Sequence, residues 1–192
     1  MPVPNPQALA FLQSRRSRPA KTLAAPAPTR EQLEPLLMAA ARTPDHGKLE
    51  PWRFIVIQGG AMPRLAHIAQ ALGTALDLNP DQIVKGRTQF DQGHLAVAVI
   101  EMQKPSEKIP ALEQTYSAGA VCLALLNAAL AAGWGASWLT NWMATDRDFL
   151  SEGLGLAAHE WVAGYVYLGS EGAQPPERPR PDMAAITTWL NE

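Results

Sequence analysis

The sequence contains a single cysteine, Cys122, among its 192 residues. No disulfide can therefore form within the chain, and a reducing compartment, the cytoplasm, is expected. Prolines interrupt the amino terminus where a secretory signal would carry a continuous apolar region. An excess of one charge is also lacking, since the formal net charge is -2, and this argues against a nucleic-acid binder that relies on bulk charge.

A strongly hydrophobic membrane span is lacking as well. The longest apolar stretch, Tyr116 to Ala132, approaches the length of about 20 residues that a bilayer requires. It is rich in alanine, however, and it includes Ser117, Gly119 and Asn127, so its total hydrophobicity is modest. We interpret it as a helix buried in a core or a subunit interface, and we predict no membrane partner.

The motifs of several enzyme classes are missing. There is no GxGxxG after a strand, no Walker loop, no HExxH and no GxSxG. The apolar surroundings of Cys122 favour a packing role over a nucleophilic one. We therefore expect neither a metal centre nor a nucleophilic triad. The histidines are scattered without metal-ligand spacing: His46, His67, His94 and His159.

What is present is typical of one globular domain that spans residues 1–192. Hydrophobic residues make up 47% and charged residues 18%, which is sufficient for a core. Helices and strands alternate irregularly, which predicts an α+β fold. Residues 18–28 are expected to be irregular, and Pro35 should kink the second helix or delay its start to about Glu34. We predict helices at 6–15, 29–41, 62–76, 111–132 and 182–190, and strands at 53–58, 95–102, 134–139 and 161–168.

Several polar groups could bind an anion. Arginine guanidinium groups hold phosphates in bidentate fashion and also donate to the edge of a planar heterocycle. Each group also has an ordinary interpretation, as surface charge, a capped turn or core packing, and taken singly that interpretation is the better one. The candidate groups are Arg15-Arg16-Ser17-Arg18, Arg42 with Asp45 and His46, Trp138-Leu139-Thr140, and Arg178 with Arg180.

Taken together and in order, these groups resemble the nitroreductase family. The run FLQSRRSRPAKTLAAPAPTREQLEPLLMAAARTPDHGKLEPWRFIVIQG is similar to the opening of its small bacterial members, in particular the subgroup with a PDHG element. The similarity continues through the apolar helix, GWGASWLT, GYVYLGS and RPRPDMAAITTWL, so it covers essentially the whole chain.

The resemblance implies an α+β sandwich, with a central and mainly antiparallel sheet flanked by helices, that assembles as an intertwined homodimer with FMN at the subunit interface. Arg15 and Ser17 would approach the phosphate and the ribityl chain, with Arg16 beside them. Arg42 and His46 would come from the partner subunit. Two positions depart from the family pattern. Pro35 lies inside the second helix, and Glu50 stands where a neutral side chain is usual. The remaining expected contacts are Trp138, Leu139 and Thr140 along the ring and Arg178 and Arg180 over the phosphate.

The activity implied is hydride transfer from NADH or NADPH to FMN, followed by reduction of a nitroaromatic, quinone or similar small acceptor in a ping-pong scheme. The chemistry would occur at the flavin N5, so no catalytic side chain is predicted. One alternative is a flavin-binding carrier or sensor without efficient turnover, and another is a cofactor-free dimer that acts through partners. Small residues on the long helix favour a close helix–helix contact in the dimer: Ala118, Gly119, Ala120, Ala124, Ala128 and Ala131.

Overall fold

The sheet is the centre of the molecule, which we describe from a computed structural model covering residues 3–191. Within those residues five strands pair in the order β1-β5-β3-β2, with β4 also pairing with β5, and every pairing is antiparallel. The strands are β1 (Leu23–Ala24), β2 (Trp52–Gln58), β3 (Leu95–Met102), β4 (Gly135–Leu139) and β5 (Glu160–Glu171).

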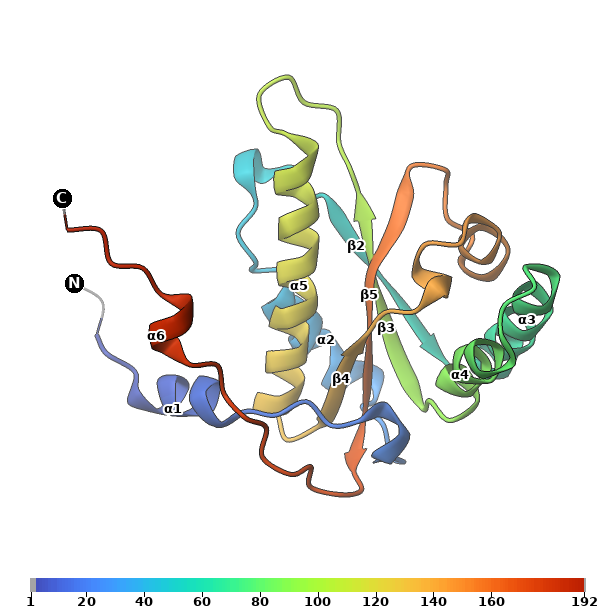
Figure 1. Cartoon of the computed structure of the whole chain (residues 1–192), viewed down its shortest axis with the longest axis horizontal. Coiled ribbons are helices and arrows are strands. Elements are labelled where there is room, and N and C mark those ends of the chain that lie inside the picture. Colours follow the sequence, from blue (N-terminus) through green and yellow to red (C-terminus); the bar gives the residue numbers. More distant parts are fainter. Residues whose placement is uncertain (1–2, 192) are drawn as a thin grey trace.

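Helices cover both faces of the sheet, which makes three layers (Figure 1). Helices α2 (Arg30–Ala40) and α5 (Ala111–Ala131) pack on one face, and α3 (Ala61–Ala75) and α4 (Pro80–Asp91) lie on the other. Strand β3 is therefore buried on both sides: Val97 and Val99 face α5, while Ala96 and Ala98 face α3. The expected α+β fold with an antiparallel sheet flanked by helices is confirmed.

Local signals account for several helix starts. Asn5 caps α1 (Pro6–Ser14) by accepting a hydrogen bond from Ala8 N, with proline at the first helical position. Thr29 and Gln32 form a complete capping box at α2, so this helix begins at Arg30 and contains Pro35. The alternative start near Glu34 was wrong: the capping box fixes the first turn, and Leu33 and Leu36 of this helix are buried in the core.

Three sequence-based predictions need correction. Helix α4 was not predicted at all, and residues 18–28, expected to be irregular, contain a short helix η1 (Ala20–Thr22) and β1. Strand β1 pairs with Ser170 and Glu171 of β5, a long-range contact that local sequence does not reveal. The last helix, α6 (Met183–Ile186), is capped by Asp182 as expected but ends before the predicted Leu190, because Thr187 has extended backbone angles.

Helix α5 has one buried side and one exposed side. Its buried residues, Cys122 and Leu125 among them, pack against α2 and the sheet. By length and composition it could cross a membrane, but the packing of this buried side is that of a core helix. Burial raises the pKa of the Cys122 thiol to about 12, which fits the predicted packing role. The exposed side carries Leu112, Tyr116 and Leu123.

At one end of the sheet an ion pair joins β2 to β5 across β3. The Arg53 guanidinium donates to both carboxylate oxygens of Glu160, from Nε at 2.7 Å and from Nη2 at 3.1 Å. Arg147 Nη1 donates to the Glu160 backbone carbonyl at 2.7 Å. The Arg53 hydrogen bonds hold the pKa of the nearly buried Glu160 below its ordinary value, against the opposing effect of desolvation.

This ion pair predicts an acid-sensitive contribution to stability. A carboxyl with a depressed folded-state pKa contributes stability that is present above its unfolded pKa, about 4.3 for glutamate, and is lost as the pH falls through the folded pKa. Glu160→Gln should therefore cost about 1.5–3 kcal/mol at pH 7 and should show less loss of stability than the wild type between about pH 5 and pH 3. Urea unfolding at each pH measures both. The exposed Glu152→Gln serves as the control, and equal acid sensitivity of Glu160→Gln and wild type would contradict the prediction.

Candidate functional site

The first part of the candidate site is a cluster of arginines at the carboxyl end of α1. Arg15 caps that helix with its backbone N–H on Phe11 O, so the following residues leave the helix at a fixed point. The Arg18 backbone N–H donates to Ala136 O of β4 at 2.8 Å, which attaches this segment to the sheet. Arg15 Nη2 lies 3.1 Å from Ser17 Oγ. The fold thus fixes Arg15, Ser17 and Arg18 beside β4.

Arg180, from the carboxyl-terminal tail, joins this cluster. Its guanidinium lies 2.8 Å from Glu177, which is also 3.5 Å from Arg16. Burial lowers the pKa of Arg15, and the positive charges of Arg180, Arg16 and Arg18 lower it further. Arg15 Nε is buried and has no hydrogen-bond partner within residues 3–191. An arginine so placed would be stabilised by an anion.

The cluster carries more positive than negative charge. Four arginines (15, 16, 18 and 180) face two glutamates, Glu171 and Glu177, an excess of two positive charges. The excess matches a phosphate monoester, which carries about −1.5 to −2 near pH 7. Arg15, Arg16 and Arg18 line a cavity of about 380 Å³ together with both glutamates and Trp134, and Arg180 reaches this group through its ion pair with Glu177. Its donor set and net charge therefore fit the phosphate end of a nucleotide-like cofactor.

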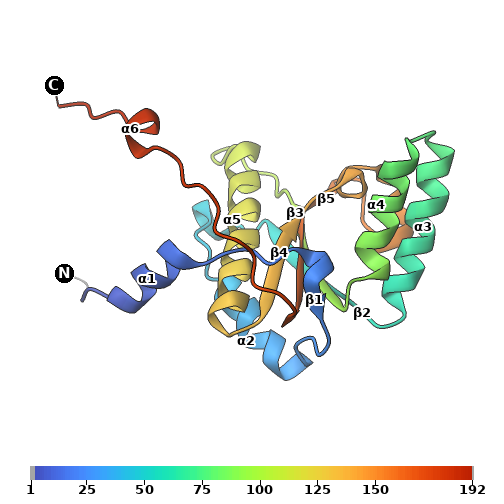
Figure 2. The same ribbon diagram turned by 60° about the horizontal axis from the view of Figure 1, so that its bottom comes forward.

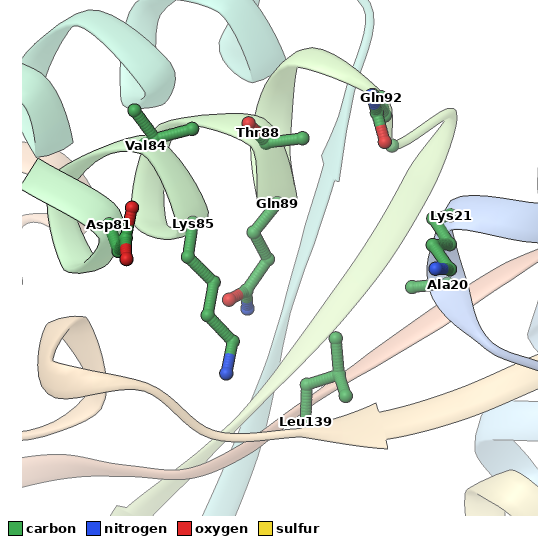
Figure 3. Close-up of a pocket in the computed structure, with 10 residues that line it drawn as sticks. Ala20, Lys21, Asp81, Val84, Lys85, Thr88, Gln89, Gln92 and Leu139 are labelled. Atoms are coloured by element: carbon green, nitrogen blue, oxygen red, sulfur yellow. The ribbon is translucent and has the colours of Figure 1, made fainter.

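An apolar cleft of about 410 Å³ borders the end of β4 (Figure 3). Some of its lining residues follow the arginine run directly in the sequence. Ala20 and Lys21, just after the arginine run, form one wall, and Leu139 forms another. Helix α4 supplies the rest of the lining, and the side chain of Lys85 extends from it into the cleft. We refer to this space as the α4 cleft. Its lining from α4 consists of Asp81, Val84, Lys85, Thr88 and Gln89, followed by Gln92 and Gly93 just after the helix.

The α4 residues are the part of the site that sequence reasoning missed. A signal was available, because Asn79-Pro80 begins α4 and Asn79 forms a capping box with Gln82. Ile83 and Phe90 then occupy the inner side of the helix at spacings of a helical period. Lys85, Thr88 and Gln89 share the opposite side, a polar face that could have been read as the wall of a ligand cleft.

The predicted ring-lining residues lie at the end of β4, on different faces. Leu139 lines the α4 cleft. Trp138 points to the opposite face of the sheet, the α5 side, because successive residues of a strand alternate between the two faces. The Trp138 indole lies directly over Gly164 of β5, where any larger residue would collide with it. Thr140 follows the strand and is exposed. Of the three, only Leu139 lines the cleft within one protomer.

Arg42 and His46 lie far from the arginine cluster. His46, in the short helix η2 (His46–Lys48), places its Nδ1 2.7 Å from Glu113 in the first turn of α5. The arginine cavity borders Leu130 in the last turn of the same helix. Seventeen residues at about 1.5 Å each separate the two points by about 25 Å. Arg42 is exposed just after α2, two residues before Pro44, whose carbonyl bonds to Ser117 of α5, and it does not line the arginine cavity.

Arg178 stays outside the cluster as well. It is exposed in the tail, and within the described residues its side chain forms no ion pair, in contrast to Arg180. Glu50, the departure from the family pattern, is exposed and has a left-handed backbone with φ 48°. No group of three or more histidine, cysteine, aspartate or glutamate side chains that could hold a metal ion occurs among residues 3–191.

Solved structures share this arrangement of helices around an antiparallel sheet. A nitroreductase-like family protein from Bacillus cereus aligns over 100% of both chains with a TM-score of 0.81 at 18% identity. A Desulfovibrio desulfuricans protein, solved in complex with FMN, aligns over 98% of both chains with a TM-score of 0.73 at 21% identity. At these identities the likeness shows the fold.

The sequence comparisons then show the family. The pattern described as "Nitroreductase family" matches residues 12–170, most of the chain. The Escherichia coli K12 protein named "Putative NAD(P)H nitroreductase YdjA" is 34% identical over 163 residues, which cover 85% of this chain and 87% of that protein. The chain therefore belongs to the nitroreductase family, as its arginine run and PDHG element predicted.

Proposed function

We propose that the protein is an FMN-dependent oxidoreductase that takes hydride from NADH or NADPH and reduces nitroaromatic, quinone or similar small acceptors by a ping-pong mechanism. The observation that carries this proposal is the excess of positive charge around the half-buried Arg15, in a segment that continues into the wall of an apolar cleft. A cofactor with an anionic end and a planar apolar end would suit the arginine cavity and the α4 cleft, respectively. The FMN complex of the D. desulfuricans protein and the name of the E. coli relative support it.

The phosphate of FMN would be bound by the arginine cluster. Arg15 and Ser17 supply charged and hydroxyl donors, with Arg16 beside them and Arg180 closing from the tail. Charge-assisted hydrogen bonds of this kind are stronger than neutral ones. Glu177 holds Arg16 and Arg180 together, so that their positive charges stay close without a ligand. We retain Arg178 as a weaker candidate, because its exposed side chain would have to turn toward the cluster.

The flavin ring would occupy the α4 cleft, bordered by Leu139 and its neighbours Trp138 and Thr140. When bound, the flavin supplies the hydride chemistry, and the protein tunes it through the charges nearby. Lys85 extends a cation into the cleft, where it would stabilise the negative charge of reduced flavin. The mostly apolar surface of the cleft would admit planar acceptors. Lys85 and Gln89 thereby join the proposed cofactor-binding residues.

We further propose that the site is completed by a homodimer. The exposed side of α5 carries Leu112, Tyr116 and Leu123, and the small Ala120 and Gly119 on that side would allow a second helix to approach closely. Helices α1 and α6 extend away from the sheet in both views (Figures 1 and 2), and neither has a buried residue. The apolar side chains exposed on α1, on α6 and on the tail after α6 are Leu9, Leu12, Met183, Ile186, Trp189 and Leu190.

An antiparallel pairing of two α5 helices would unite the two halves of the site. The amino end of one helix would then lie beside the carboxyl end of the other. Arg42 and His46 of one protomer would thus approach the arginine cluster of its partner, which accounts for their separation within a single chain. We keep the cytoplasm as the proposed compartment, with Cys122 as a buried free thiol.

The absorbance of the purified protein tests this function. We expect a yellow protein with a flavin spectrum that is bleached under anaerobic conditions by NADH or NADPH and restored by a quinone or nitroaromatic acceptor. A flavin spectrum without bleaching would favour the carrier or sensor instead. A colourless protein that binds no added FMN would exclude both flavin functions.

Arg15→Ala should weaken FMN binding. The substitution removes a charge-assisted contact worth about 1.5–3 kcal/mol, which corresponds to roughly 10- to 150-fold in the dissociation constant. Quenching of FMN fluorescence on titration with apoprotein measures the constant. Arg30→Ala is the matched control, because Arg30 is an exposed arginine of α2 that pairs only with Glu34 in the described residues. Equal affinity in the two variants would place the phosphate elsewhere.

Leu123→Glu should dissociate the dimer. The change introduces a charge into the exposed side of α5, where a helix–helix contact would bury it unpaired, at a cost of several kcal/mol. Light scattering at micromolar concentration should give the mass of a dimer for the wild type and of a monomer for the variant. Leu76→Glu, at the end of α3, is the control and should remain dimeric. A wild type that is monomeric when loaded with FMN would refute the shared site.

A further inference from the structure

The PDHG loop, residues 44–50, is held in a single conformation by its own aspartate. Asp45 Oδ1 accepts a hydrogen bond from Leu49 N at 2.7 Å, and Oδ2 accepts one from Glu50 N at 3.1 Å. These bonds close a tight turn in which Lys48 and Glu50 have left-handed backbones, with φ 55° and 48°. Strained residues of this kind persist only where their surroundings fix them. The backbone of the loop is therefore fixed, and with it the position from which the His46 side chain projects.

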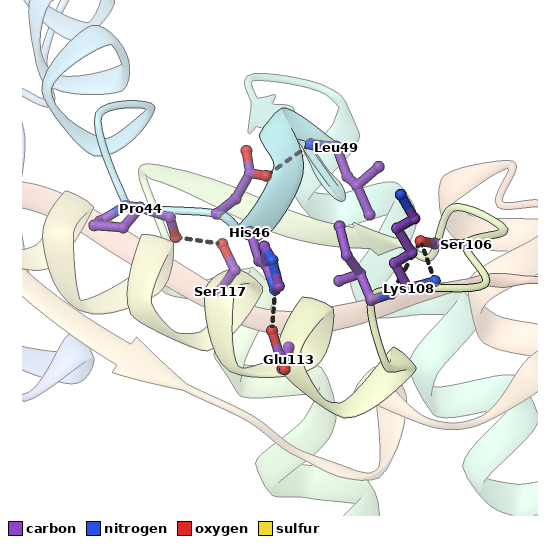
Figure 4. A network of polar contacts seen from close by, with 9 residues as sticks. Pro44, His46, Leu49, Ser106, Lys108, Glu113 and Ser117 are labelled. Carbon is purple, nitrogen blue, oxygen red and sulfur yellow. Dashed lines mark hydrogen bonds and ion pairs between the residues drawn. The ribbon is translucent and has the colours of Figure 1, made fainter.

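Helix α5 supports the same loop from below (Figure 4). Ser117 Oγ donates to the Pro44 carbonyl at 3.0 Å and accepts a hydrogen bond from Trp52 Nε1 at 3.2 Å. One turn earlier on the helix, Glu113 Oε2 lies 2.7 Å from His46 Nδ1. The loop is thus anchored at its start by Ser117 and at its histidine by Glu113.

The contact between His46 and Glu113 defines which ring nitrogen is free. An ionised carboxylate only accepts hydrogen bonds, so Nδ1 carries the proton and Nε2 is left to meet another molecule. Both side chains are more than 45% exposed, and ion pairs between exposed groups add little to stability. The consequence of this contact is accordingly the orientation of the imidazole.

We propose that Glu113 is a positioning residue of the flavin site, which fixes the ring and the tautomer of His46 so that Nε2 meets the FMN of the partner subunit. The inference rests on the proposed function, in which His46 completes the site across the dimer. Glu113 itself touches His46 and not the cofactor. Its place in the first turn of α5 couples the dimer helix to the loop, so the same element that would pair the subunits also orients the histidine.

The tautomer gives a readout that does not depend on turnover. With 15N-labelled histidine at about pH 8.5, where an ordinary imidazole is neutral, we expect the Nδ1–H tautomer for His46 in the purified wild-type protein. Glu113→Ala should shift the signal toward the Nε2–H form, and His46→Ala assigns it among the four histidines. Glu113→Gln keeps an acceptor oxygen and should retain the wild-type tautomer. An unchanged tautomer in Glu113→Ala would overturn the proposal.

A double-mutant cycle on FMN affinity tests whether Glu113 acts through His46. Glu113→Ala should raise the dissociation constant about three- to tenfold, Glu113→Gln should restore most of the affinity, and neither should matter in a His46→Ala background. Glu107→Gln, an exposed acid before α5, is the control for charge alone. A loss of affinity that persists without His46, or no rescue by glutamine, would overturn the positioning role while leaving the oxidoreductase intact. A wild type that binds no FMN would refute the proposed function itself.

Discussion

The two-sided character of α5 is the constraint on which the site depends. One side of the helix packs against α2 and the sheet, and the other leaves leucine and tyrosine side chains exposed. When an apolar helix is buried on one side, burial of its exposed apolar side as well lowers the free energy further. Its two ends carry different halves of the candidate site, with the PDHG loop at the amino end and the arginine cavity at the carboxyl end. Pairing two such helices antiparallel would satisfy the exposed surface and the divided site at once.

The arginine segment illustrates how the fold prepares a charged site without a ligand. The backbone hydrogen bond from Arg18 to Ala136 fixes the segment on β4. Glu171 pairs with Arg18, and Glu177 contacts both Arg16 and Arg180. The remaining excess charge is concentrated around Arg15, whose pKa is lowered. Preorganisation of this kind reduces the entropy that binding an anion would otherwise cost.

The sequence predicted most of the fold because its signals there are local. Asn5, the capping box of Thr29 and Gln32 and the periodic apolar strands specify their elements without reference to distant residues. Strand β1 escaped prediction because two residues become a strand only through pairing with β5. Helix α4 escaped because its polar cleft-facing side dilutes the apolar pattern, and the α4 cleft was missed with it. The family and the α+β sheet are confirmed, whereas the roles of the individual site residues stay predictions.

The position of Cys122 has a consequence for the proposed activity. Quinones and related acceptors are electrophiles, and they alkylate accessible thiolates. In this protein the sole sulfhydryl is enclosed between α5 and the sheet, and its pKa of about 12 keeps it protonated at physiological pH. With the proposed acceptors as substrates, this burial would protect the protein from covalent self-inactivation.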